Sequence, residues 1–107
     1  AGVAPAVAVG RGTGVDDARL AHKRAVVAQA LARHAGHRTG GGSGDALATL
    51  ASLGGLELAA LAGATVAAAE RRVAVVVDGF IATVAALVAA HLDRAVLPAL
   101  VFAHRSA

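Results

Sequence analysis

Residues 73–77 most constrain the fold of this chain, because they are apolar at every position and stop abruptly at Asp78 and Gly79. A short run rich in valine predicts a strand, and its lack of alternation is typical of a parallel sheet with both faces covered. A helical segment then begins at Gly79 and extends over residues 79–92, before a second apolar run at residues 99–103. This order predicts a strand, helix, strand unit with a right-handed crossover.

The N-terminal part of the chain is predicted to form a strand, a glycine loop and a helix. Residues 3–9 form a short apolar run with valines at alternating positions, which predicts a buried strand. The glycine loop GRGTG follows at residues 10–14, and two acids then begin a helix over residues 16–34. Acids are favoured there because the positive end of the helix macrodipole attracts negative charge.

The middle of the chain contains a glycine-rich segment and two more helices. Residues 36–44 are rich enough in glycine to predict a flexible surface loop. Asp45 is then expected to cap a short helix that ends near Ser52, before a pair of glycines. A longer helix is predicted over residues 56–72, with an acid in its first turn and arginines at its end.

Alternating strands and helices predict an α/β fold: part of a doubly wound, mainly parallel sheet with flanking helices, or an incomplete Rossmann-like domain. We expect residues 1–107 to form a partial α/β nucleotide-binding domain. The chain begins almost inside a predicted strand, without an initiator methionine, and stops just after another, so we expect a fragment. Without neighbouring strands the sheet would expose apolar edges, which favours aggregation.

Composition argues against several classes of protein. The net charge is only +3, the basic residues are scattered, and Phe80 and Phe102 are the only aromatic residues, so we expect no nucleic-acid binding. No uncharged stretch reaches the roughly 18 residues that cross a bilayer, so we expect no membrane span. The absence of cysteine is typical of a reducing compartment and agrees with a cytoplasmic protein. The five histidines show no metal-ligand spacing, so no metal site is expected.

The glycine loop has the chemistry of an anion site, because small residues let backbone N–H groups approach phosphate oxygens. It matches the dinucleotide motif GxGxxG only in part, and no acid ends a following strand at the usual distance. Lys23 lies on the next helix, where it either faces solvent or supplies charge to a phosphate. Glu57 is most simply explained as an acid that complements the dipole of its helix.

Four segments, GRGTGVDDARLAHK, LGGLELAALAGA, VVVDGF and AHRSA, occur in an order that resembles the nicotinate-nucleotide:dimethylbenzimidazole phosphoribosyltransferase family. The resemblance covers nearly all of the chain but only a central part of a family member. It implies transfer of the phosphoribosyl group of nicotinate mononucleotide to dimethylbenzimidazole, giving α-ribazole phosphate and nicotinate. It also implies a homodimer in which no cofactor takes part.

By matching positions within these motifs, the resemblance implies that Gly12, Lys23, Gly79 and Ser106 line the pocket for the nucleotide phosphate and ribose. Glycine supplies backbone donors, lysine supplies charge and serine supplies a hydroxyl donor. The family's catalytic base is a glutamate in a motif downstream of AHRSA, and Glu57 belongs to another block. We therefore assign no catalytic residue in this chain and expect the chain alone to be inactive.

Two alternatives remain open at this point. The first is a non-catalytic nucleotide-binding or interaction module of α/β type, which would bind nicotinate mononucleotide without forming product. The second is an incomplete dinucleotide-binding domain, which would prefer NAD to the mononucleotide. The substrate preference and the presence of product distinguish these hypotheses.

Overall fold

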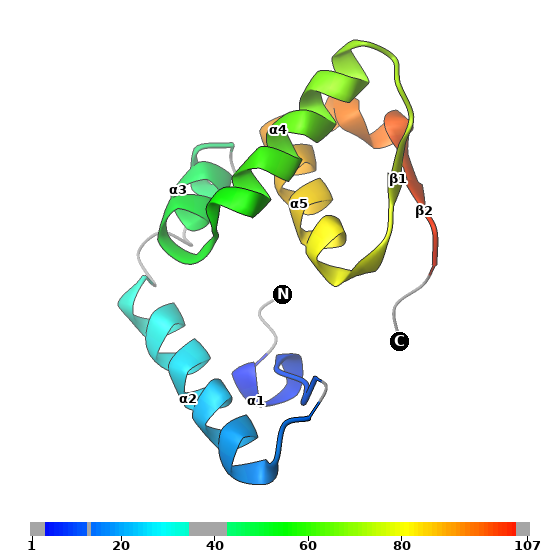
Figure 1. Ribbon diagram of the computed structural model, residues 1–107. Helices are drawn as coiled ribbons and strands as arrows, with labels where there is room; N and C mark the ends of the chain where they lie inside the picture. The colour runs from blue at the N-terminus through cyan, green and yellow to red at the C-terminus, as the bar shows by residue number, and fades with distance from the viewer. Residues whose placement is uncertain (1–3, 13, 35–42, 105–107) are drawn as a thin grey trace. The chain divides into compact units, whose positions relative to one another are not determined.

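The computed structural model describes residues 4–12, 14–34 and 43–104, which are mostly helical with two short strands (Figure 1). The chain divides into two compact units, residues 1–36 and residues 37–107, and each is described by itself. The assignment of the whole chain to one partial nucleotide-binding domain stays a prediction.

The first unit begins with a single helical turn, α1 (Pro5–Ala8), so the strand predicted over residues 3–9 is wrong in its described part. The N–H groups of Val7 and Ala8 both donate to the carbonyl of Ala4, at 2.9 and 3.0 Å. A strand needs backbone partners on a neighbouring strand, and the described residues of this unit contain none. The segment therefore satisfies its backbone groups locally, with proline at a helical position that suits its fixed φ.

The second element of this unit, α2 (Asp17–Arg33), confirms the helix predicted after the glycine loop. Its cap residue is Asp16, whose carboxylate accepts a hydrogen bond from the Arg19 N–H at 2.8 Å. Leu20 is buried on this helix, which packs against α1. The two predicted acids thus lie where the helix dipole and the free N–H groups favour them.

The second unit begins with α3 (Ser43–Leu53) and α4 (Leu56–Glu70), which confirm both helices predicted here. The sequence predicted Asp45 as the cap of this helix. Because α3 starts at residue 43, Asp45 lies in its first turn instead. The remainder of the predicted flexible loop, residues 36–42, lies outside the described residues. A Cβ at Gly54 would lie 2.6 Å from the Leu50 carbonyl oxygen, so the close turn between the helices requires glycine.

The strand, helix, strand unit is confirmed by β1 (Val75–Val77), α5 (Gly79–Leu92) and β2 (Leu100–Phe102). The two strands are parallel and pair in register from Val75 with Leu100 to Val77 with Phe102 (Figure 1). A 3₁₀ helix, η2 (Arg94–Ala99), leads into β2, so the second strand begins one residue later than predicted. The hand of the crossover stays a prediction.

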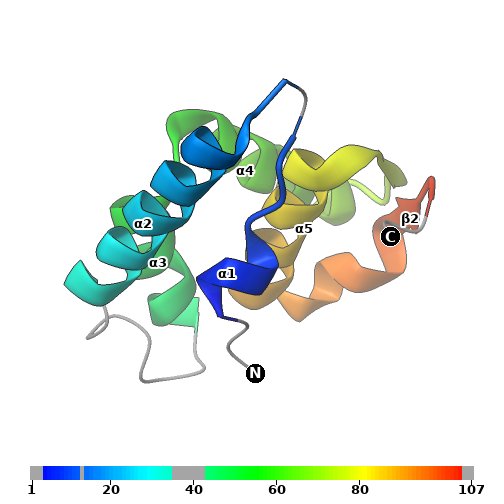
Figure 2. The same ribbon diagram turned by 90° about the horizontal axis from the view of Figure 1, so that it is seen from below.

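The core of the second unit lies where α4, α5 and η2 meet; Figures 1 and 2 both show α4 beside α5. Ala62 of α4, Ala89 of α5 and Val96 of η2 are at most 1% exposed and form one cluster. Methyl side chains let the two helices approach closely, as the abundance of alanine suggests. None of the described helices combines the length and the apolar character that crossing a membrane would require.

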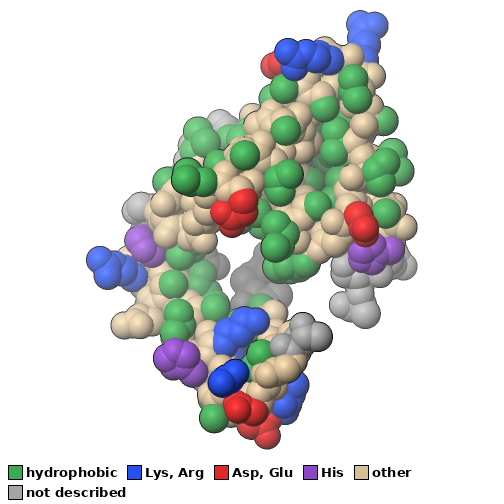
Figure 3. Space-filling model, viewed as in Figure 1, with side chains coloured by type: hydrophobic (Ala, Val, Ile, Leu, Met, Phe, Trp, Pro, Cys, Tyr) green, Lys and Arg blue, Asp and Glu red, His purple; other side chains and the backbone are tan. Residues whose placement is uncertain are grey.

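One face of the small sheet is exposed, which corrects the expectation that both faces are buried. Val77 is 3% exposed, whereas Val76 is 68% exposed and its register partner Val101 is also exposed. Hydrophobic side chains lie on the surface of this region in Figure 3. The described residues thus form a mostly helical arrangement with a two-stranded parallel sheet, which is compatible with the α/β class.

The C-terminus of α4 closes in a Schellman motif, with Arg72 in the left-handed region at φ 57°. The Arg72 N–H donates to Ala69 and the Val73 N–H donates to Ala68, both at 2.9 Å. This pair of bonds satisfies two of the carbonyls that end the helix. Glycine is the usual residue at the left-handed position, because a Cβ is strained there.

We expect Arg72→Gly to stabilise the fold by about 0.5–1 kcal/mol, because relief of the left-handed strain exceeds the added entropy of the unfolded chain. Urea unfolding followed by circular dichroism measures the change. Arg71→Gly is the matched control, since Arg71 has φ −86° and its guanidinium reaches the Ala67 carbonyl. Equal destabilisation by both substitutions would contradict this account.

Candidate functional site

The carboxyl ends of β1 and β2 lie at the same edge of the sheet, because the strands are parallel. Backbone pairing continues one step past the strands, where the Ala103 N–H donates to the Val77 carbonyl at 3.0 Å. The residues that follow each strand, 78–79 and 103–104, are thereby held next to one another. Ligands of open α/β sheets bind at this kind of edge.

An Asp–His pair joins the two strand ends. Nδ1 of His104 lies 2.9 Å from Oδ1 of Asp78, and the two side chains are 51% and 74% exposed. Asp78 also occupies the cap position of α5 with extended backbone angles, yet its side chain makes no capping hydrogen bond. The carboxylate therefore binds across the strand ends and not to its own helix.

Gly79 lies directly after this aspartate, at the first position of α5. Its φ is +84°, in the region that glycine adopts most readily. A Cβ at this position would meet no atom within 4 Å, so backbone strain and not crowding selects glycine. The sequence prediction that Gly79 follows the strand and opens the helix is confirmed.

The glycine loop of the first unit links α1 to α2, so it is a helix, loop, helix connection and not the strand, loop, helix that was predicted. Gly12 and Gly14 have φ values of 69° and 73°, which again favour glycine. Lys23 of α2 reaches back to this loop, with Nζ 3.5 Å from the Gly10 carbonyl oxygen. The structure therefore places the lysine head group beside the loop.

Acidic side chains at the start of α2 are bound by donors of the same unit. The Asp16 carboxylate caps α2, and Asp17 forms an ion pair with Arg11 of the glycine loop. The cap uses one of the N–H groups that an anion would otherwise bind at this helix. The donors that remain at this loop are the Lys23 head group and the N–H groups of the loop itself.

Comparison with known proteins identifies the family. A family model described as phosphoribosyltransferase matches residues 1–107. The chain belongs to this phosphoribosyltransferase family. Proteins named nicotinate-nucleotide–dimethylbenzimidazole phosphoribosyltransferase are 51% identical in Aromatoleum aromaticum and 50% identical in Dechloromonas aromatica, over 98% and 99% of this chain. A protein of the same name from Cupriavidus taiwanensis is 54% identical over 92% of the chain.

The phosphoribosyltransferase chain spans 29%, 30% and 27% of the lengths of these three relatives, respectively. No solved structure matches it significantly. The family assignment therefore rests on sequence, and the local geometry described above belongs to a part of the length of its relatives.

The phosphoribosyltransferase motifs occupy defined places in the two units. Gly12 and Lys23 belong to the first unit, where Lys23 contacts Gly10 of the loop that also contains Gly12, and Gly79 belongs to the second. Ser106 lies outside the described residues. The sequence analysis did not predict the contact between His104 and Asp78. Each residue directly follows an apolar run, so parallel pairing of the two runs was the signal that could have indicated the contact.

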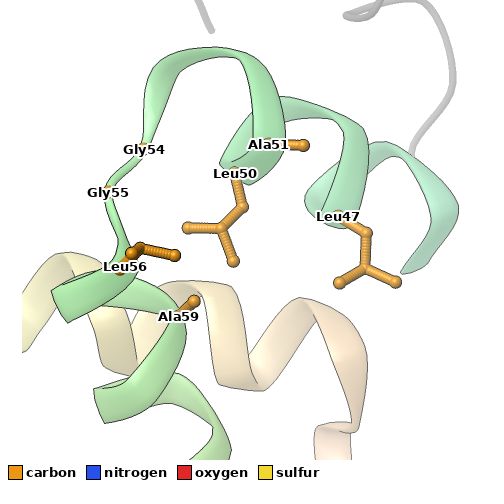
Figure 4. A pocket seen from close by; sticks show the side chains of 7 residues that line it. All are labelled: Leu47, Leu50, Ala51, Gly54, Gly55, Leu56 and Ala59. Carbon is orange, nitrogen blue, oxygen red and sulfur yellow. The ribbon is translucent and has the colours of Figure 1, made fainter.

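An apolar hollow of about 350 Å³ lies between α3 and α4 of the phosphoribosyltransferase chain (Figure 4). Its lining is aliphatic or glycine throughout: Leu47, Leu50, Ala51, Gly54, Gly55, Leu56 and Ala59. These side chains offer no group that transfers a proton or binds a charge. Elsewhere in the described residues, no three His, Asp or Glu side chains form a group that could hold a metal ion.

We expect Gly79→Ala to destabilise the protein by about 1 kcal/mol, because alanine is strained at positive φ. Gly63→Ala is the matched comparison, since Gly63 lies inside α4 and a Cβ there would also meet no atom within 4 Å. That substitution should stabilise by about 1 kcal/mol through helix propensity. Chemical denaturation of both variants measures the two signs, and the same sign for both would contradict the strain argument.

Proposed function

We propose that the protein containing this chain transfers the phosphoribosyl group of nicotinate mononucleotide to dimethylbenzimidazole and releases nicotinate. The observation that carries this proposal is identity of about half of all positions to relatives of that name, across nearly the whole chain. The strand ends and the glycine loop support it, because both are geometries at which nucleotides are commonly bound.

Lys23 and Gly12 are proposed to hold the nucleotide phosphate. The Lys23 head group is exposed and makes a single long contact, 3.5 Å, to a backbone carbonyl among the hydrogen bonds described. A contact of this length to an uncharged carbonyl is easily exchanged for a shorter bond to the negatively charged phosphate. Gly79 and Ser106 are proposed, from the family resemblance, to contact the nucleotide through a backbone N–H and a hydroxyl.

The finer fold assignment is also a proposal. We propose that the two strands belong to a doubly wound, mainly parallel sheet, because one face of the pair exposes Val76 and Val101. Apolar side chains on a sheet face are normally covered in α/β proteins. A cytoplasmic homodimer is proposed from the family resemblance alone.

The chain alone is proposed to be inactive. Attack of an azole nitrogen on the anomeric carbon requires a base that removes the ring N–H proton on the side opposite the leaving pyridine. The only glutamates are Glu57 and Glu70, in the first and last turns of α4, and neither belongs to the motif that carries the base in the resembled family. The proposed base therefore lies outside these residues.

The test is an assay of the full-length protein with nicotinate mononucleotide and dimethylbenzimidazole, with α-ribazole phosphate and nicotinate separated by liquid chromatography. Product is expected from the full-length protein and not from the 107-residue chain. Mononucleotide binding without product from the full-length protein would instead favour a non-catalytic module. A preference for NAD would favour the dinucleotide-binding alternative.

We expect Lys23→Ala to weaken binding of nicotinate mononucleotide about 10- to 100-fold, which is the loss of one charge-assisted hydrogen bond. Isothermal titration calorimetry of the full-length protein measures this change. Arg33→Ala removes an exposed cation from the last turn of the same helix and should leave the affinity unchanged. Equal weakening by both substitutions would show a general charge effect and contradict a specific phosphate contact.

A further inference from the structure

Asp78 is an acid at the carboxyl end of a parallel strand, and its side chain is 74% exposed. It directly precedes α5 but makes no capping hydrogen bond. The left-handed φ of Gly79, +84°, explains this, because a turn at the first helical residue departs from the geometry in which a preceding acid reaches the helix N–H groups. The carboxylate of Asp78 is therefore not bound by its own helix.

The two carboxylate oxygens of Asp78 have different surroundings. Oδ1 lies 2.9 Å from Nδ1 of His104, on the neighbouring strand end. Within residues 4–12, 14–34 and 43–104, no hydrogen bond or ion pair is formed to Oδ2. A carboxylate can accept several hydrogen bonds. One oxygen is thus held by the protein, and the other can accept a hydrogen bond from a ligand.

Strand pairing fixes the place of this Asp–His pair. Val77 pairs with Phe102 in register, and the Ala103 N–H donates to the Val77 carbonyl at 3.0 Å. The contact to His104 restrains rotation of the Asp78 side chain, so less conformational entropy is lost when Oδ2 binds a donor. The histidine therefore preorganises the carboxylate for a ligand at the strand ends.

The charge of the carboxylate selects the chemistry of that ligand. A carboxylate accepts hydrogen bonds and repels anions, so a neutral donor such as a hydroxyl suits it better than a phosphate. In dinucleotide-binding α/β domains, an acid accepts a hydrogen bond from a ribose hydroxyl. The ribose is also the part of nicotinate mononucleotide that carries hydroxyl donors, since its phosphate and its nicotinate carboxylate are anionic.

We propose that Asp78 binds a ribose hydroxyl of nicotinate mononucleotide through Oδ2, with His104 as the positioning residue that holds the carboxylate through Oδ1. The identity of the sugar rests on the proposed function, whereas the available acceptor rests on the geometry. The neighbours in sequence agree with this assignment. Gly79 directly follows Asp78, Ser106 lies two residues after His104, and both are proposed to contact the same nucleotide.

Nucleotides that lack one hydroxyl test this assignment. The probes are nicotinate mononucleotide and its 2′-deoxy and 3′-deoxy analogues, each titrated into the full-length protein by calorimetry without dimethylbenzimidazole. Removal of the hydroxyl that Asp78 binds should weaken binding about 10- to 100-fold, the effect of one hydrogen bond to a charged group. If neither analogue binds more weakly than the parent nucleotide, the proposal is overturned.

Substitution of the acid should have the same effect as removal of the hydroxyl. Asp78→Ala should weaken binding of the parent nucleotide about 10- to 100-fold and should abolish discrimination against the affected analogue, because both changes remove one hydrogen bond. Asp78→Asn keeps the size of the side chain and a carbonyl acceptor, so its loss should be intermediate. Equal weakening of the parent and both analogues by Asp78→Ala would overturn the proposal, since a structural or general charge effect does not distinguish between hydroxyls.

Asp93→Asn is the matched control for the charge. Asp93 is an exposed acid at the other end of α5, and its carboxylate accepts a hydrogen bond from the Ala95 N–H at 2.8 Å. Asparagine removes the negative charge and keeps the cap. This variant should bind all three nucleotides as the unmodified protein does, and a loss equal to that of Asp78→Asn would overturn a specific contact of Asp78.

His104 is tested through the same discrimination between nucleotides. His104→Ala should weaken binding of the parent about 2- to 10-fold and reduce discrimination against the affected analogue, because the carboxylate is no longer restrained. His104→Asn keeps an N–H donor near the position of Nδ1 and should restore both. In an Asp78→Ala background, His104→Ala should have no further effect. Unchanged discrimination in His104→Ala would overturn the positioning role of the histidine.

The product assay separates this inference from the proposed function. Discrimination between hydroxyls that depends on Asp78, in a full-length protein that forms no α-ribazole phosphate, supports the ribose contact and rejects the proposed reaction. Formation of α-ribazole phosphate by a protein that binds the parent and both analogues equally supports the reaction and rejects the ribose contact.

Discussion

Close packing of α4 against α5 is the contact on which the second unit depends. Ala62 and Ala89 are buried at this contact, and Val96 of η2 completes the same cluster. A single residue, Asp78, separates β1 from α5, and η2 leads directly into β2. The position of α5 therefore sets the position of both strands. Larger side chains at the buried alanines would separate the helices and shift the strand ends, because protein interiors have little free volume.

Local signals explain why the long helices could be predicted from the sequence. Glycines mark the starts of α4 and α5, acids mark the starts of α2 and α4, and these signals act within one or two turns. Residues 3–9 have no comparable signal, because alternating valines favour a strand only where a partner strand is present. The exposure of Val76 has the same origin: its cover depends on elements that its neighbours in sequence do not specify.

Within the candidate site, the glycines were predictable from the sequence and the contact between side chains was not. Glycine motifs located Gly12 and Gly79, and the structure gives both positive φ values, which explains the residue type at each position. The contact between Asp78 and His104 was not predicted, since it requires the register of two strands in addition to their existence. A parallel pair of strands brings together the residues that follow each strand. Asp78 and His104 are therefore neighbours because of the strand register.

The acidic residues of the glycine loop and those at the strand ends follow one physical rule, although the two places belong to separate units. Each of three carboxylates has a donor from the protein: the Arg19 N–H for Asp16, Arg11 for Asp17 and His104 for Asp78. A carboxylate that is already hydrogen-bonded to a cation or an N–H group repels a nearby anion less than a free one does, because part of its charge is compensated locally. The acidic residues of each loop are therefore compatible with the anion binding that the proposed function requires. The donors of these carboxylates thus contribute to the electrostatics of each loop, together with the residues that the motifs identify.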